Sequence, residues 1–207
     1  MLQYITNTAS RRPVIDQVAT VLEGGCRWVQ LRMKDASDDE IRHVVKEIKP
    51  LCDRVGAFLL LNDRVELARE LEVSGVHLGK EDMPLSQARG ILGAGAVIGV
   101  TVNTFEDVLR VANLDIDYLG MGPFRHTETK KNLAPVLGLE GVADICRRMK
   151  ESDIDIACVA VGGIEVADVP ELLKAGVQGV AVSGAIANAG DALETTRSFL
   201  AFANPEA

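Results

Sequence analysis

The chain has 207 residues, of which 47% are hydrophobic and 25% are charged, and its formal net charge at pH 7 is −8. This length supports one large hydrophobic core and lies near the lower limit for a compact eight-unit α/β barrel. The acidic balance argues against nucleic acid or an anionic membrane surface as a partner. A phosphate ligand would therefore have to be held by local cations, backbone N–H groups or a metal ion.

The cysteines and the amino-terminal sequence indicate a cytoplasmic protein. The four cysteines are far apart and form no C-x-x-C pair, which argues against a zinc site and predicts buried thiols in a reducing compartment. The amino-terminal residues lack the basic start and the long apolar stretch of a signal peptide, and no apolar run is long enough to span a membrane.

Short apolar runs alternate with helical patterns along the chain. The predicted strands cover residues 3–7, 28–33, 58–62, 75–79, 97–102, 118–122, 157–163 and 179–184. The predicted helices lie near residues 14–23, 38–55, 65–71, 85–92, 105–112, 139–150, 169–175 and 189–202. This strict alternation predicts an α/β fold, a (β/α)8 TIM barrel, and because no linker divides the chain we expect one catalytic domain over residues 1–207.

A doubly wound open sheet is the alternative fold. It would more often have about five to seven strands and a G-x-G-x-x-G turn after its first strand. Here the first predicted strand is followed by T-A-S-R-R-P at residues 8–13, which contains no glycine. The barrel is therefore favoured.

The second predicted strand carries polar side chains at alternate positions. Gln30, Arg32 and Lys34 are spaced i, i+2 and i+4, so in a strand they share one face. Helices cover the outside of a β/α barrel, and these side chains would then point into the barrel. Two cations there need an anion, because burying them unpaired costs several kcal/mol. The pattern predicts a polyanion site, with an ordinary solvated strand face as the alternative.

Carboxylates follow the third and fourth predicted strands. Asp63 comes directly after Asn62, and Asp82 lies in the G-K-E-D segment of residues 79–82. Carboxyl ends of parallel strands meet at one end of a barrel, and Mg²⁺ is typically held there by one or two carboxylates plus phosphate oxygens. We expect a Mg²⁺ site, the alternative being that each aspartate caps the helix that follows it.

Three further segments lie at the same end of the predicted barrel. The connection of residues 122–138 is long for a strand-to-helix loop and carries Thr127, Thr129 and Lys130, so it is either functional or a surface insertion. The seventh predicted strand ends in Gly162-Gly163 and the eighth in Ser183-Gly184, at the place where barrels commonly bind phosphate. Two anionic ligands are therefore expected, a metal-bound diphosphate and a monophosphate.

Together these segments resemble the thiamine phosphate synthase family, over residues 5 to about 203. The motifs that carry the resemblance are Q-L-R-M-K at 30–34, N-D-R-V-E-L-A at 62–68, G-V-H-L-G-K-E-D-M-P at 75–84, G-M-G-P at 120–123, T-E-T-K-K at 127–131 and V-G-G-I at 161–164. The resemblance implies a transferase with small-molecule substrates. It would join hydroxymethylpyrimidine diphosphate to (carboxy)hydroxyethylthiazole phosphate, giving thiamine phosphate and diphosphate by Mg²⁺-assisted dissociative substitution.

The resemblance also implies a role for each matched position. The pyrimidine diphosphate would be bound by Gln30, Arg32, Lys34, Asn62 and Thr101, and Mg²⁺ by Asp63 and Asp82. The thiazole phosphate site would be formed by Thr127, Glu128, Thr129, Gly163, Ser183 and Gly184. Arg32, Lys34 and Lys130 would act catalytically, because they would stabilise the leaving diphosphate.

The chain departs from the family pattern at three places. Thr101 replaces a usual serine, Ser183-Gly184 stands where Val-Ser is common, and Asn103 lies where a histidine is often seen. The nearest alternative, a thiazole tautomerase, would predict loss of a metal carboxylate and a histidine near position 103. A non-catalytic ligand-binding barrel would need neither Lys130 nor two metal carboxylates. An isomerase or aldolase would want a Schiff-base lysine at a strand end, and Lys34 alone has that position.

Overall fold

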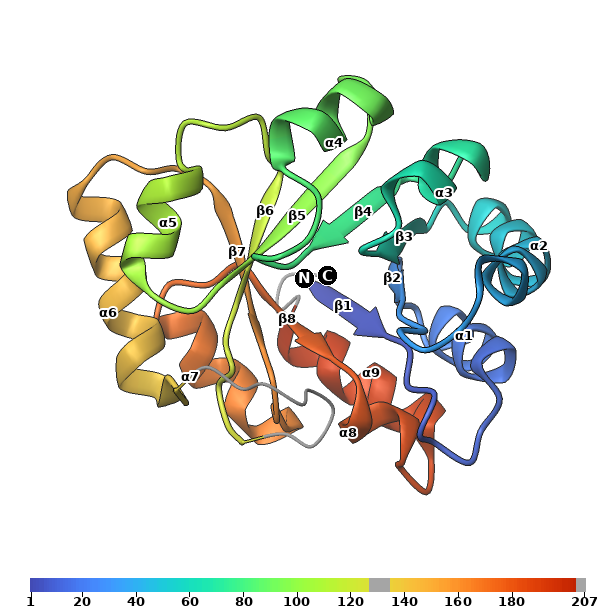
Figure 1. Ribbon diagram of the computed structural model, residues 1–207. Helices are drawn as coiled ribbons and strands as arrows, with labels where there is room; N and C mark the ends of the chain where they lie inside the picture. Colours follow the sequence, from blue (N-terminus) through green and yellow to red (C-terminus); the bar gives the residue numbers. More distant parts are fainter. Residues whose placement is uncertain (127–134, 204–207) are drawn as a thin grey trace.

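The computed structural model describes residues 1–126 and 135–203 and contains a closed parallel barrel. Its strands pair in chain order, and β8 closes the barrel by pairing with β1 (Figure 1). The strands are β1 Leu2–Ile5, β2 Trp28–Leu31, β3 Phe58–Asn62, β4 Gly75–Leu78, β5 Val97–Val102, β6 Tyr118–Met121, β7 Ala157–Val161 and β8 Gly179–Val182. The predicted (β/α)8 barrel is confirmed.

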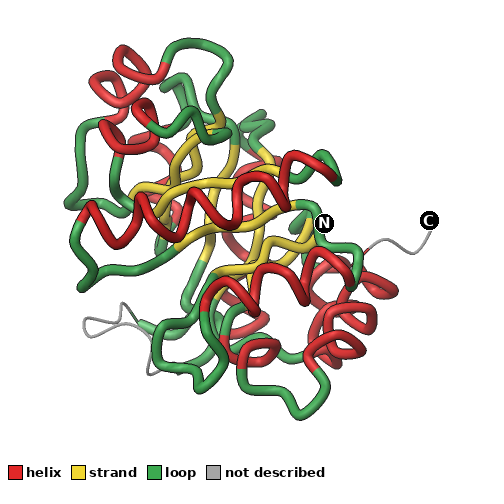
Figure 2. The backbone as a smooth tube through the Cα atoms, turned by 90° about the vertical axis from the view of Figure 1, so that its right-hand side faces the viewer, coloured by secondary structure: helices red, strands yellow, loops and turns green. Residues whose placement is uncertain are grey.

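Helices surround the barrel on its outside, as both views of the backbone show (Figures 1 and 2). They are α1 Val14–Glu23, α2 Asp38–Arg54, α3 Val65–Glu70, α4 Leu85–Leu92, α5 Phe105–Val111, α6 Gly138–Glu151, the 3₁₀ turn η1 Val166–Asp168, α7 Val169–Lys174, α8 Gly184–Ala187 and α9 Ala192–Ala203. The predicted helix of residues 189–202 is α9, which begins three residues later. The short elements η1 and α8 were not predicted.

The α-helices α2 and α5 begin at reciprocal side-chain caps that the sequence encodes. Ser37 accepts from the backbone N–H of Glu40 at 3.3 Å, and the Glu40 carboxylate accepts from the Ser37 N–H at 2.8 Å. Thr104 and Asp107 make the same reciprocal pair at the start of α5. These capping boxes satisfy backbone donors that lack a partner inside the helix, so they fix where the chain leaves the barrel end.

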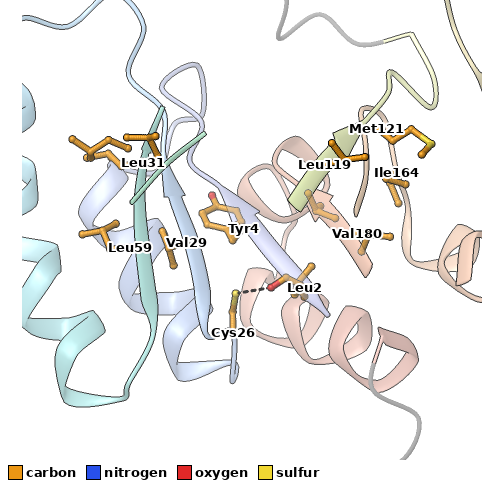
Figure 3. Close-up of a cluster of buried hydrophobic side chains, with 14 of the residues drawn as sticks. Leu2, Tyr4, Cys26, Val29, Leu31, Leu59, Leu119, Met121, Ile164 and Val180 are labelled. Atoms are coloured by element: carbon orange, nitrogen blue, oxygen red, sulfur yellow. Dashed lines mark hydrogen bonds between the residues drawn. The ribbon is translucent and has the colours of Figure 1, made fainter. Parts of the chain in front are cut away.

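Alternating side chains divide the apolar residues into an outer and an inner layer. The outer layer lies between strands and helices and includes Val29, Leu31 and Leu59 (Figure 3). The inner layer fills the barrel near the amino ends of the strands, around Leu60, Tyr118, Val159 and Ala181. The inner layer is small, which leaves the rest of the interior to polar side chains.

The cysteines form no disulfide in the described part of the chain. Cys26, Cys52 and Cys158 are buried and Cys146 is half-buried, so the expected free thiols are present. The Cys26 Sγ lies 3.6 Å from the carbonyl oxygen of Leu2 (Figure 3). Within residues 1–126 and 135–203, no helix combines the length and the apolar character needed to cross a membrane.

Candidate active site

The polar residues that follow the strands gather at one end of the barrel, because all eight strands run in the same direction. Asn62 ends β3, Thr101 lies near the end of β5, and Ser183 follows β8. This is the end at which barrel enzymes carry their catalytic groups. The expected residues Thr127, Glu128, Thr129 and Lys130 lie outside the described residues.

Neither predicted metal carboxylate caps a helix. The first residue before α3 is Arg64 and that before α4 is Pro84, and neither helix start has a side-chain cap. Asp82 instead accepts a hydrogen bond from the Gly79 N–H at 2.6 Å, which folds the G-K-E-D turn. Asp63 adopts a left-handed backbone with φ of 66°, a conformation that non-glycine residues rarely take and that often marks functional sites. The capping alternative is therefore wrong for both aspartates.

The two carboxylates are close enough to perturb each other. Burial and the neighbouring Asp82 raise the pKa of Asp63 to about 6, while the charges of Lys34 and Arg32 act in the opposite direction. The Lys34 Nζ lies 3.7 Å from the Asp63 Oδ2. A like-charged pair flanked by cations is costly unless a further group neutralises it, so the cluster has the character of a functional site.

The donor set of this pair fits a hard divalent cation. Both side chains offer oxygen ligands, which Mg²⁺ prefers, and Mg²⁺ usually takes only one or two carboxylates. Among the described residues, no three or more histidine, cysteine, aspartate or glutamate side chains are grouped as metal ligands. Phosphate oxygens and water would therefore complete the coordination.

The cations lie beyond the strand that was expected to carry them. β2 ends at Leu31, so the prediction that residues 28–33 form one strand is wrong at its carboxyl end. Beyond Leu31, the Arg32 N–H donates to the Thr6 side-chain Oγ1 at 2.9 Å, a side-chain partner in place of a strand carbonyl. Of the three expected polar side chains, Gln30 alone lies on the strand itself, where it points into the barrel and is 1% exposed. Arg32 is half-buried, and Lys34 is 49% exposed at the rim.

Partial burial acts on the charge of Arg32. Desolvation lowers the pKa of this guanidinium, while Asp63 and Asp35 raise it. The residue has a high ordinary pKa, so it stays cationic and is held beside the carboxylate pair. An anionic ligand at this place would meet one half-buried cation and one exposed cation.

A chain of polar side chains crosses the barrel interior behind Thr101. The His77 ring bonds the Thr101 Oγ1 through Nε2 at 2.9 Å and the Tyr118 hydroxyl through Nδ1 at 2.9 Å. Tyr118 in turn accepts from Gln3 at 2.8 Å. Sequence reasoning did not single out His77, Tyr118 or Gln3. Their inward positions on apolar strands were the available signal, because a polar residue on the inner face of a barrel strand needs a partner.

The glycines after β7 contact the neighbouring loop, so they have a structural role in addition to any role in ligand binding. The Arg125 N–H donates to the Gly162 carbonyl, and the Arg125 guanidinium donates to the Gly163 carbonyl, each at 2.9 Å. Arg125 also forms an ion pair with Asp168. Gly163 has φ of 67°, and a Cβ on it would lie 2.8 Å from the Arg125 Cβ. The start of the long loop after β6 is therefore docked on these glycines.

Three other positions that the sequence analysis named have local structural partners. Asn103 donates its side-chain amide to the carbonyl of Gly122, which ties the ends of β5 and β6 together. The Ser183 carbonyl accepts from Ile186 and Ala187, so the chain turns at once into α8. Gly184 lies at the beginning of that turn, beside Asn188.

A cavity of about 380 Å³ opens at the opposite end of the barrel. It is lined by the residues that begin the strands, among them Trp28, Phe58, Val97, Tyr118 and Ala157. Its walls are mainly apolar, so it does not suit a phosphate. The carboxylates Asp63 and Asp82 and the cations Arg32 and Lys34 lie at the other end, and the candidate active site is assigned there.

The fold and these groups define the class of the protein as a (β/α)8-barrel enzyme with its polar cluster at the carboxyl ends of the strands. A sequence model described as thiamine monophosphate synthase matches residues 2–186. A thiamine-phosphate synthase of Bacteroides thetaiotaomicron is 52% identical over 199 residues, which cover 96% of this chain and 95% of that protein. The chain therefore belongs to the thiamine monophosphate synthase family, and it is a transferase.

More distant relatives agree with this assignment. A thiamine-phosphate synthase of Flavobacterium johnsoniae is 40% identical over 185 residues, which cover 89% of this chain and 87% of that protein. The solved thiamine phosphate pyrophosphorylase from Pyrococcus furiosus has a TM-score of 0.87 and 32% identity, with 99% of this chain and 95% of that chain covered.

Proposed function

We propose that this protein joins hydroxymethylpyrimidine diphosphate to (carboxy)hydroxyethylthiazole phosphate, releasing diphosphate and forming thiamine phosphate. One observation carries the proposal: two carboxylates, Asp63 and Asp82, lie together at the catalytic end of the barrel with Lys34 and Arg32 beside them. A diphosphate bridged by a divalent cation satisfies all four charges at once.

The chain's own side chains would handle the leaving group. Arg32 and Lys34 would bind the diphosphate and offset the negative charge that develops as its bond to the pyrimidine CH₂ breaks. Asp63 and Asp82 would hold Mg²⁺, which supplies Lewis-acid stabilisation of the phosphate oxygens when bound. Lys130 is proposed to reach the same diphosphate.

The remaining positions would orient the two rings. Gln30, Asn62 and Thr101, which come from β2, β3 and β5, would contact the pyrimidine diphosphate. Gly163, Ser183 and Gly184 would bind the thiazole phosphate through backbone N–H groups, and Thr127, Glu128 and Thr129 would complete that site. The site would hold the thiazole nitrogen against the pyrimidine CH₂ and exclude water. The nitrogen would then form a bond to this carbon as the bond between the carbon and diphosphate breaks, so no protein nucleophile is required.

The tautomerase alternative is less well supported. A histidine was expected near position 103 for a tautomerase, and Asn103 instead donates its side-chain amide to the Gly122 carbonyl. A tautomerase also has no diphosphate to activate, so it would not need the Asp63–Asp82 pair to hold a metal ion. The pair equally disfavours a barrel that binds a ligand without catalysis.

The direct test mixes the purified protein with both substrates and Mg²⁺ and measures thiamine phosphate by mass spectrometry. Wild-type protein should form it, and Asp63→Ala should form it far more slowly. Asp155 is an exposed carboxylate outside the cluster, so Asp155→Ala is a matched control that should retain wild-type turnover. Wild-type protein that binds the thiazole phosphate but forms no product with both substrates would overturn the proposal in favour of the non-synthase alternatives.

A further inference from the structure

The interior hydrogen bonds behind Thr101 have a direction that can be derived by counting donors. The Gln30 amide Nε2 donates to the Gln3 Oε1 at 3.4 Å, so the Gln3 amide presents its own Nε2 to Tyr118 at 2.8 Å. The Tyr118 oxygen is therefore an acceptor on that side. Burial raises the pKa of Tyr118, so the phenol keeps its proton. The Gln30 side chain also hydrogen-bonds Tyr118 and acts as a donor, because this contact lowers the pKa of the phenol. The single Tyr118 proton therefore has the His77 Nδ1, 2.9 Å away, as its acceptor.

The same counting fixes the tautomer of His77. With Nδ1 accepting from Tyr118, the neutral ring carries its hydrogen on Nε2. Nε2 then donates to the Thr101 Oγ1, 2.9 Å away. A threonine hydroxyl that accepts from the ring has its own hydrogen left to give, and Thr101 lies near the carboxyl end of β5, beside the candidate site.

The barrel is built to hold these two rings. A Cβ on Gly99 would lie 2.0 Å from the Tyr118 Cζ, and a Cβ on Gly120 would lie 2.8 Å from the His77 Cε1. The absence of both side chains makes room for the rings inside the barrel. Trp28 packs edge-on against Tyr118, with 4.6 Å between ring centroids, and so restricts the Tyr118 ring further. The rings therefore have little freedom to change partners.

We propose that His77, oriented by Tyr118, is a positioning residue that fixes the Thr101 hydroxyl as a hydrogen-bond donor to the pyrimidine diphosphate. This inference rests on the proposed function, because it takes that substrate as the ligand of Thr101. Without the Tyr118 hydroxyl, the His77 ring can place its hydrogen on Nδ1 and accept from Thr101. The Thr101 hydrogen then points back into the barrel and is lost to the substrate.

The tautomer is measured directly by ¹⁵N NMR of the imidazole rings. The chain has three histidines, so the His77 signals are assigned by their loss in His77→Gln. Wild-type protein should show a neutral ring protonated at Nε2, and Tyr118→Phe, which lacks the donor to Nδ1, should show a larger share of the ring protonated at Nδ1. A wild-type ring that is protonated at Nδ1, or at both nitrogens at neutral pH, would overturn the inference.

The consequence for the substrate is measured by calorimetry with hydroxymethylpyrimidine diphosphate and, separately, thiazole phosphate. Tyr118→Phe and Thr101→Val should each weaken the pyrimidine diphosphate by about tenfold, the usual worth of one hydrogen bond to a charged or buried partner. The double variant should be no worse than Thr101→Val alone, because both changes remove the same contact. The thiazole phosphate should bind as before.

Two further variants separate positioning from folding. Tyr4 is also a fully buried tyrosine, and its hydroxyl donates to Gln17 at 2.7 Å in the outer layer, so Tyr4→Phe is a matched control that should leave both affinities unchanged. His77→Gln keeps an amide donor in place of Nε2 and should retain most of the affinity that His77→Leu loses.

The outcomes of the two proposals are distinguishable. Wild-type protein that does not bind the pyrimidine diphosphate refutes the proposed function and this inference with it. Wild-type protein that binds and turns over the substrate, with unchanged affinity in Tyr118→Phe or additive losses in the double variant, refutes only the role of His77.

Discussion

The carboxylate pair should make the metal-free protein less stable than a variant that lacks one carboxylate. The pKa of Asp63 rises from 3.8 to about 6 in the folded protein, and its side chain is only 25% exposed. At about 1.4 kcal/mol per pH unit, this shift corresponds to about 3 kcal/mol of folding free energy. The effects of Lys34 and Arg32 are already included in that shift.

The sign follows from proton binding. Because the folded-state pKa is raised, the folded protein binds more protons than the unfolded chain between about pH 4 and pH 6, so stability falls as the pH rises through this window. Above pH 6 the full destabilisation is present. Asp63→Asn removes the charge, and asparagine is among the residues that best tolerate the left-handed backbone at this position.

The assay is urea unfolding in EDTA at pH 5 and pH 7.5. We expect the free energy of unfolding of Asp63→Asn to exceed that of wild type by up to about 3 kcal/mol at pH 7.5. The difference between the two free energies should shrink at pH 5. The same variant should be nearly inactive with Mg²⁺. Asp155→Asn, a change at an exposed carboxylate, should alter neither quantity. If Asp63→Asn is no more stable than wild type at pH 7.5, the carboxylate pair does not carry the inferred strain.

Three further predictions concern the site. EDTA or Asp63→Ala should lower turnover by roughly two to four decades, the worth of a lost Lewis acid, as measured by product formation with and without added Mg²⁺. Gly163→Ala should destabilise the protein by about 1–3 kcal/mol, because of the left-handed backbone and the Arg125 contact, whereas Gly190→Ala, with nothing within 4 Å, should be nearly neutral in urea unfolding. Lys130→Ala should lower kcat far more than Lys131→Ala in steady-state kinetics, and equal, near-wild-type values would remove Lys130 from the site.

The sequence predicted the architecture because the alternation of short apolar runs and amphipathic helices is a local property. The predicted end of β2 was wrong, because the strand ends where a side chain from another segment binds its backbone. The Arg32 N–H donates to Thr6 on the neighbouring segment, and that contact cannot be read from the order of residues 28–33. The four-residue helix α8 was missed for a similar reason, because so short an element carries no periodicity.

The sequence predicted which residues form the candidate site better than it predicted the contacts between them. Asp63 and Asp82 stood out because acidic residues after consecutive strands must meet at one end of a barrel. The prediction for Gly163 was incomplete, because it missed the contact with Arg125, which lies 38 residues away along the chain. His77 lies in an apolar run, and its partners Tyr118 and Thr101 lie on two other strands, so the sequence alone does not show how its ring is oriented.

The backbone at Asp63 explains how a barrel strand can deliver two consecutive polar residues to one site. Successive side chains of a strand point to opposite faces, so Asn62 faces inward and the next residue would face the helix layer, as Leu61 does. The left-handed turn at Asp63 breaks this alternation and lets the carboxylate lie beside Asp82 and Lys34. The site is therefore destabilised twice, by backbone conformation and by like charge, and binding of the proposed cation and anionic substrate would recover the loss.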